Sequence, residues 1–299
     1  MALTDLSRCS AASRHRADPQ AGSAPVASRW LLIEHQGPWS KKPLQTPPLA
    51  GPVGVEIEET AASFGAKVLL MRRPGRRDSD DDVRSWYAVD TVRRTGLRGI
   101  WRTSDDLVAA AHALGPQLSA SDEDAEPMVL VCTHAMRDAC CAVRGRPIVA
   151  TLAKARPDEV WECTHLGGHR FAGTLLSLPD GACLGRLDPD TAVAAVAALR
   201  EDVVDTQYLR GVTRWVEPVQ AALIAVLGAH GPGSLDDLTP GLVDASDDGS
   251  HTTVEVLGRR SMPARTVVEV VAEALPDAPL SCGDKPKAHT AYRTELRPA

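Results

Sequence analysis

Apolar runs of strand length alternate with amphipathic stretches in two similar series along this chain. In the first series the pattern predicts strands at 30–35, 67–73, 86–92 and 98–103, with helices at 53–64 and 105–114. An acid-rich turn is expected at 78–82. After a polar linker at 119–127 the order restarts, with predicted strands at 128–132, 160–165, 173–179 and 182–188 and helices at 141–154 and 190–202. The repetition indicates two units of similar design.

The order shared by the two series is strand, helix, three strands and helix, which is the order of a thioredoxin-like layer. We therefore predict an α/β fold with two tandem thioredoxin-like units, at 29–118 and 126–212. Residues 1–28 show no period and are expected to be extended or loosely docked. Residues 213–299 are predicted to form a small α+β extension. It has a helix from about 213 to 227, a Gly/Pro/Asp-rich stretch to 250, and strand-like runs at 252–258, 265–275 and 289–296.

Composition and charge narrow the class of protein. The 299 residues are 43% hydrophobic and contain no apolar stretch near the ~20 residues that span a bilayer, nor an apolar secretory signal. Seven cysteines, an odd number, fit a reducing compartment, so we expect a cytoplasmic protein. The net charge of −6 gives no electrostatic footprint for nucleic acid. The arginine and alanine bias indicates a GC-rich bacterial genome.

Four metal-capable side chains lie in two short clusters of the second unit. Cys132 and Cys141 are separated by eight residues, and His165 and His169 follow in a His-x3-His pair. Two thiolates and two imidazoles can hold a zinc ion or a two-iron cluster. Structural zinc sites usually bring cysteines in tighter pairs, whereas a [2Fe–2S] rhombus needs donors spread around two irons, so the spacing favours iron. Gly167 and Gly168 disfavour a helix between the histidines and predict a loop.

The run from Cys132 to Gly173 resembles the signature of the sucrase/ferredoxin-like family, and the similarity extends to residues 14–39 and 281–293. The cluster-binding half of that family is a thioredoxin-like ferredoxin. The resemblance implies that a [2Fe–2S] cluster is held by a long-spaced cysteine pair and, in this branch, a later histidine pair. Carried over, these ligands are Cys132, Cys141, His165 and His169. Cys140 directly precedes Cys141 and stays an alternative ligand.

Other residues near the two clusters are candidates to surround the metal centre or to pack in the core. Arg137 is a candidate to offset the negative charge of the sulfurs, and Gly167 and Gly168 are candidates to donate backbone N–H groups to them. His134 is predicted to be a neighbour of the centre or a surface residue. Core packing is the expected role of Cys163 and Cys183, and a free or buried thiol is the expectation for Cys9 and Cys282.

These features predict an electron-transfer protein, a carrier or a sensor, with no catalytic residues assigned. Histidine ligands are neutral, so such a cluster is less reducing than one held by four cysteines, and its potential can depend on pH. The chain has no nucleotide-binding glycine fingerprint, so a separate redox partner protein is expected. Two alternatives are a thioredoxin-type thiol-disulfide oxidoreductase, which lacks its Cys-x-x-Cys motif here, and a structural zinc protein with the same four ligands.

Overall fold

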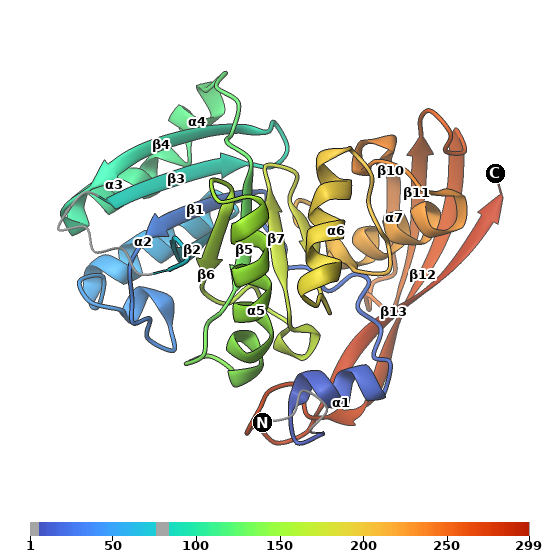
Figure 1. The fold of residues 1–299 in the computed structure, drawn as a ribbon. Coiled ribbons are helices and arrows are strands. Elements are labelled where there is room, and N and C mark those ends of the chain that lie inside the picture. Colours follow the sequence, from blue (N-terminus) through green and yellow to red (C-terminus); the bar gives the residue numbers. More distant parts are fainter. Residues whose placement is uncertain (1–5, 76–83, 299) are drawn as a thin grey trace.

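Two β-sheets organise the chain in the computed structural model, which describes residues 6–75 and 84–298 (Figure 1). The larger sheet has nine strands in the order β4-β3-β1-β2-β6-β5-β7-β8-β9. Its strands are β1 (Arg29–Glu34), β2 (Ala66–Arg72), β3 (Arg84–Asp90), β4 (Thr95–Trp101), β5 (Met128–Cys132), β6 (Val160–Cys163), β7 (Leu175–Leu178), β8 (Ala182–Leu184) and β9 (Leu209–Val212). The predicted α/β class is confirmed. The turn expected at 78–82 lies outside the described residues.

Seven α-helices and three short 3-10 turns accompany the strands in the described part of the chain. The helices are α1 (Cys9–His15), α2 (Pro52–Ser63), α3 (Ser104–Ala113), α4 (Pro116–Ala120), α5 (Ala139–Ala155), α6 (Pro189–Arg200) and α7 (Glu217–His230). The 3-10 turns are η1 (Pro43–Gln45), η2 (His169–Phe171) and η3 (Leu235–Asp237). Local capping explains several helix starts. In α3, Thr103 and Asp106 form a reciprocal capping box, which satisfies backbone N–H groups that the first turn leaves unpaired.

The two sequence series pair their strands in the same way. In the first, β1 is parallel to β2 and antiparallel to β3, which pairs with β4. In the second, β5 is parallel to β6 and antiparallel to β7, which pairs with β8. The two series join through a short antiparallel contact of β2 with β6, at the pairs Met71–Cys163 and Arg72–Glu162. The strands of both series therefore share one continuous sheet.

Side chains alternate between the two faces of the large sheet. On β1, Leu31 and Ile33 pack in one core with residues of α2 and α3, whereas Trp30 and Leu32 pack in another that includes Leu130 of β5. The central strands β1 and β5 are apolar on both faces because both faces are covered. The second of these cores contains Cys132 and Cys141 and reaches across both halves of the sheet.

The C-terminal region forms the second sheet. Its four antiparallel strands are β10 (Leu238–Ala245), β11 (His251–Gly258), β12 (Arg265–Ala278) and β13 (Lys287–Pro298). Alternating valines of β11 and β12, such as Val254 and Val268, are buried in one core with residues of α7. The sequence pattern did not indicate β10, because Pro240 and Gly241 interrupt it. The strand lies at the sheet edge, and its pairing with β11 shifts between Pro240 and Val243.

The N-terminal segment is not extended throughout. The described residues include α1, in which Cys9 to Ser13 are buried, and this helix packs against η2. Figure 1 shows α1 beside the loop end of the β12–β13 hairpin, so the N-terminal helix meets the C-terminal sheet there, while the C-terminus itself lies at the far end of β13. The expectation of an extended or loosely docked segment is wrong for Cys9–His15, because small side chains let a short helix pack closely without a strong amphipathic period.

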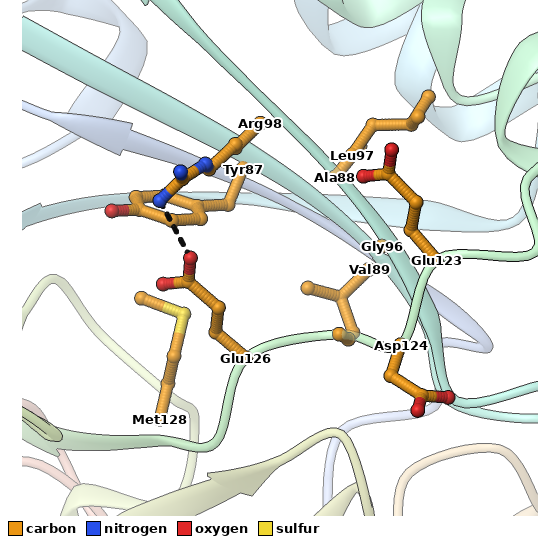
Figure 2. Close-up of a pocket in the computed structure, with 11 residues that line it drawn as sticks. Tyr87, Ala88, Val89, Gly96, Leu97, Arg98, Glu123, Asp124, Glu126 and Met128 are labelled. Carbon is orange, nitrogen blue, oxygen red and sulfur yellow. Dashed lines mark hydrogen bonds and ion pairs between the residues drawn. The ribbon is translucent and has the colours of Figure 1, made fainter.

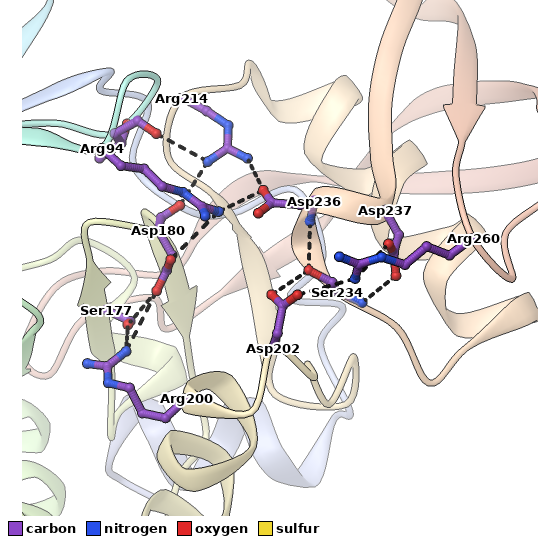
Figure 3. A network of polar contacts seen from close by, with 11 residues as sticks. Arg94, Ser177, Asp180, Arg200, Asp202, Arg214, Ser234, Asp236, Asp237 and Arg260 are labelled. Carbon is purple, nitrogen blue, oxygen red and sulfur yellow. Dashed lines mark hydrogen bonds and ion pairs between the residues drawn. The ribbon is translucent and has the colours of Figure 1, made fainter. Parts of the chain in front are cut away.

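A network of polar contacts connects turns of the large sheet with η3 (Figure 3). Arg94, in the β3–β4 turn, forms an ion pair of 2.7 Å with Asp236, and Arg214 donates a hydrogen bond of 2.9 Å to the Asp180 carbonyl. Asp236 also lies 4.0 Å from Arg214. Such partly exposed pairs each stabilise a fold by about 0–1 kcal/mol, so their main effect here is to position η3.

Among the described residues, none of the helices combines the length and apolar character needed to cross a bilayer.

Candidate metal centre

Cys132 and Cys141 are held by a strand-loop-helix unit. Cys132 is the last residue of β5, and Cys141 lies in the first turn of α5. Asp138 begins the helix, because its side chain accepts a 2.8 Å hydrogen bond from the Cys140 backbone N–H. The Cys141 backbone N–H donates to the Asp138 carbonyl at 3.1 Å. The loop 133–138 thus turns the chain back so that Cys132 and Cys141, which eight residues separate, lie at one place.

The approach of α5 to the end of β5 depends on Gly145. A Cβ atom at this position would lie 2.2 Å from the Cys132 carbonyl oxygen, which is too close for any side chain. The glycine therefore lets the helix backbone pass directly over the strand end that holds Cys132. Sequence reasoning did not single out Gly145. An isolated glycine inside a predicted helix was the signal available for it.

His165 and His169 lie on the predicted loop. Thr164, just after β6, accepts a 3.0 Å hydrogen bond from the Leu70 N–H, and its own N–H donates to the Leu70 carbonyl at 2.8 Å, which ties the start of this loop to β2. Gly167 and Gly168 then adopt φ angles of 76° and 62°, in the left-handed region. This backbone turns the chain so that the two imidazole rings stack, with centroids 4.8 Å apart.

Arg210 packs under the turn at Gly167 and Gly168 and donates a hydrogen bond to it. The sequence pattern did not indicate this residue. Its side chain is 1% exposed, and its guanidinium donates a 3.1 Å hydrogen bond to the Gly167 carbonyl. It also contacts the Ser23 carbonyl and hydroxyl. A Cβ atom at Gly168 would lie 2.5 Å from this guanidinium. A buried arginine is retained only where its N–H groups find acceptors, so the turn and Arg210 stabilise each other.

The structure brings three of the four predicted ligands into one group and places the fourth beside it. The Nδ1 atom of His165 lies 3.7 Å from the Cys141 sulfur and 4.0 Å from the Cys132 sulfur. All three donor atoms lie within 4.8 Å of one another. On the other side of the same ring, Nε2 of His165 lies 3.2 Å from Nδ1 of His169. The donors thus run from two thiols through one imidazole to the next.

The two thiols and the two imidazoles differ in their exposure to solvent. Cys132 and Cys141 are completely buried, whereas both histidines are partly exposed. A hydrogen bond from the Cys141 thiol, together with one from His165, lowers the pKa of Cys132 well below its ordinary value, and the same bond between the thiols raises the pKa of Cys141. The pair therefore favours one thiolate stabilised by one thiol. Burial lowers the pKa of His169 to about 4, so its imidazole is neutral near pH 7 and able to bind a metal.

Cys140 has different neighbours from Cys141. Its sulfur lies 3.3 Å from the sulfur of Cys282 and 3.6 Å from that of Cys9. Successive residues of a helix point about 100° apart, so two adjacent cysteines cannot both face the same group. A thioredoxin-type enzyme needs two thiols that can form one disulfide with each other, whereas the sulfurs of Cys140 and Cys141 lie in different groups.

The remaining candidates fall into surface and core positions. Arg137 is exposed on the loop between β5 and α5. His134 is 1% exposed and is not a surface residue. Its ring packs edge-on against Trp39 at 6.0 Å, and its Nε2 lies 3.0 Å from the Ser40 carbonyl. Cys163 and Cys183 are fully buried, and burial raises the pKa of both thiols, as is typical of unreactive core cysteines.

A separate pocket of about 200 Å³ lies between β3, β4 and the segment 123–128 (Figure 2). It shares no lining residue with the thiol-imidazole group. Arg98 and Glu126 form an ion pair of 2.7 Å at this pocket, and Glu123 and Asp124 lie along the same segment. The mixture of one cation with three carboxylates does not extend the chemistry of the metal centre.

The chain belongs to the sucrase/ferredoxin-like family, whose model matches residues 20–211. The matched range contains the four thiol and imidazole groups, their loops and Arg210. A search of curated proteins and a search of solved structures each found no match. Family and geometry together show that this site offers cysteine and histidine groups able to hold a metal ion. Thiolate and imidazole are the donors that suit both zinc and iron–sulfur clusters, so the residues present fit such a group.

Proposed function

We propose that this protein is an electron-transfer protein that binds a [2Fe–2S] cluster through Cys132, Cys141, His165 and His169. A cluster bound there supplies reversible one-electron chemistry. The observation that carries the proposal is that two buried thiols meet the imidazole of His165, on whose partly exposed ring the imidazole of His169 stacks. We further propose that the two halves of the large sheet are thioredoxin-like units, supported by their identical strand pairing, and that only the second unit carries ligands.

The two thiols are buried and the two imidazoles are partly exposed, which indicates the side from which a redox partner would exchange electrons. The thiolates of Cys132 and Cys141 lie inside, at the end of β5, and we place them on one iron. The imidazoles of His165 and His169 lie toward solvent, and we place them on the other. Electron exchange with a partner is fastest across the shortest path, so a partner would dock over the histidine loop.

Two neutral ligands also change the electrostatics of the centre. Replacing two thiolates by imidazoles removes two negative charges, which makes an added electron easier to accept. Each neutral imidazole keeps one proton on the nitrogen that does not bind a metal, and that proton can be lost or regained as the charge of the centre changes. Partial exposure of both rings leaves a route for this proton to solvent. A separate reductase or acceptor protein completes the reaction.

A structural zinc site is the second candidate, and one observation favours it. Of the four proposed ligands, Cys132, Cys141 and His165 place their donor atoms within 4.8 Å of one another, a spacing suited to a single ion, while His169 lies on the far side of the His165 ring. Zinc has no accessible redox states, so this centre would hold the loops in place and transfer no electron.

Anaerobic purification of the full-length protein distinguishes the two candidates. The proposal predicts two irons and two acid-labile sulfides per chain, a brown colour, visible absorbance that dithionite bleaches, and an electron paramagnetic resonance signal in the reduced state. Colourless protein that carries zinc in this centre, and that forms no cluster after reconstitution with iron and sulfide, would overturn it. A reconstituted cluster that is not reducible would also contradict electron transfer as the function.

A further inference from the structure

Four other side chains converge at a second place, which we term the second thiol cluster: Cys9, Asp138, Cys140 and Cys282. They come from three segments that are far apart in sequence. Cys9 begins α1, Asp138 and Cys140 start α5, and Cys282 lies in the loop between β12 and β13. Figure 1 shows α1 next to this end of the β12–β13 hairpin, under α5.

The three sulfur atoms form a nearly regular triangle. The Sγ–Sγ distances are 3.3 Å between Cys140 and Cys282, 3.6 Å between Cys9 and Cys140, and 3.6 Å between Cys282 and Cys9. In a tetrahedral zinc site with Zn–S bonds of about 2.3 Å, adjacent sulfurs lie about 3.8 Å apart. An outward movement of a few tenths of an ångström would bring the triangle to that size.

Asp138 supplies an oxygen to the same place. Both of its carboxylate oxygens lie 3.8 Å from the Cys9 sulfur. The Cys282 N–H and the Ser281 hydroxyl donate to Oδ2 at 2.7 and 3.0 Å, while Oδ1 accepts a 2.8 Å bond from the Cys140 N–H and a longer one, 3.8 Å, from the Cys9 thiol. When a metal displaces the Cys9 proton, Oδ1 loses this thiol donor and has a lone pair available for the ion. The bonds from the protein fix the orientation of the carboxylate, as outer hydrogen bonds do for metal ligands.

The surroundings suit a soft metal ion with a path for entry. Cys9 and Cys140 are almost fully buried, whereas Cys282 is partly exposed and lies next to the exposed residues from 283 onward. The N-terminal end of the 17-residue helix α5 points its backbone dipole at the group, which stabilises anionic sulfur. Without a metal the cluster can stay close to neutral as thiols, as the donation from the Cys9 thiol to Asp138 indicates, and a bound cation would balance the charge of the three thiolates and the carboxylate.

We propose that Cys9, Cys140, Cys282 and Asp138 form a second metal site, which binds Zn²⁺ and fastens α1 and the β12–β13 loop to the start of α5. Binding displaces the protons of the three thiols and changes no oxidation state. The site is independent of the proposed cluster, although Cys140 and Cys141 are neighbours in the chain. Its role is structural, because three thiolates and a carboxylate fill the four positions of a tetrahedral zinc ion.

Metal analysis of the full-length protein tests this site without reference to electron transfer. After growth with added Zn²⁺ and treatment with a chelator, the wild type is expected to retain one zinc per chain besides its iron. Cys9→Ser and Cys282→Ser should each lose this zinc and keep the iron and the visible absorbance. Cys183→Ser replaces a buried thiol outside both groups in the same way and keeps an acceptor for Arg210, so it is the matched control and should retain both metals. Co²⁺ loaded in place of zinc should give a near-ultraviolet thiolate-to-cobalt absorption that Cys9→Ser and Cys282→Ser lack.

Circular dichroism spectra of the variants separate loss of zinc from loss of folding, and Cys282 is the safer position because it lies in a partly exposed loop. Three results would overturn the proposal: wild-type protein that retains no more zinc than Cys282→Ser, zinc that disappears with Cys132→Ser but stays in Cys9→Ser, or peptide mapping that finds a Cys140–Cys282 disulfide in protein purified anaerobically.

Discussion

Cys140 and Cys141 are adjacent in sequence, yet their sulfur atoms belong to two different groups. The sulfur of Cys141 lies 3.7 Å from Nδ1 of His165, whereas that of Cys140 lies 3.3 Å from the sulfur of Cys282. The first turn of α5 thus serves two sites at once. The rotation of about 100° per helical residue is the reason, because it points neighbouring side chains in clearly different directions.

Ligand identity is the first prediction from this divergence. Cys132→Ser and Cys141→Ser should abolish the cluster or strongly destabilise it, because each removes a thiolate at the buried end of the donor series. Cys140→Ser should retain iron, sulfide and the visible spectrum. Iron and sulfide analysis of the three anaerobically purified variants is the measurement. Iron lost with Cys140→Ser but kept with Cys141→Ser would reverse the assignment of the two cysteines.

The histidines should set the reduction potential. His165→Cys and His169→Cys are each expected to keep a cluster but to lower its midpoint potential, because added negative charge beside iron disfavours the reduced state. In the wild type, the potential should fall by about 59 mV per pH unit above the pKa of the oxidised centre, the slope for one proton per electron. Each cysteine variant should lose part of this slope. A wild-type potential that is constant from mildly acidic to strongly alkaline pH, and unchanged in both variants, would show that neither histidine is a ligand.

Burial of His169 should make the metal-free protein sensitive to mild acid. The pKa of His169 is lowered from its ordinary value of 6.5 to about 4 in the folded chain. Between these two pH values the unfolded chain binds more protons at this residue than the folded chain does. The free energy of unfolding is therefore highest above pH 6.5 and decreases as the pH falls toward 4. His169→Gln should remove this component. Urea unfolding of metal-free wild type and variant over that range checks it, and parallel pH profiles would contradict the assignment.

Two helix glycines should respond in opposite directions to alanine. Gly145→Ala places a Cβ atom against the Cys132 carbonyl and should destabilise the fold by about 1–3 kcal/mol, as overpacking does, and also reduce iron content. Gly228→Ala, inside α7, meets only the Thr206 hydroxyl at 3.6 Å and should stabilise the fold by about 0.5–1 kcal/mol. Denaturant unfolding measures both. Equal effects at the two positions would show that α5 does not need its close approach to β5.

Sequence patterns predicted the local elements because each depends on neighbours in the chain. Buried runs such as residues 128–132 appear as strands, and the amphipathic stretch that begins near Cys141 appears as a helix. Where short-range signals conflicted, prediction was weaker. Pro240 and Gly241 hid an edge strand, and α1 was missed because its small residues show no clear period.

The chain by itself also determined the type of the candidate site. Two spaced cysteines, a histidine pair and two glycines between the histidines define a donor set and a loop, and these depend only on residue chemistry and short spacing. Tertiary structure decided which donors meet. Burial of Arg210 under the glycine turn, the passage of α5 over Cys132 at Gly145, and the direction of each cysteine in α5 all depend on packing between distant segments.

The second thiol cluster shows this limit most clearly. Cys9, Cys140 and Cys282 are separated by more than a hundred residues in each step, and no local pattern relates them. They meet because the α1 helix and the loop end of the β12–β13 hairpin both lie beside the start of α5. The pairing of β2 with β6, which joins the two halves into one sheet, is likewise a contact between distant segments. Such contacts arise from the complementary surfaces of folded elements, which the periodicity of a sequence does not encode.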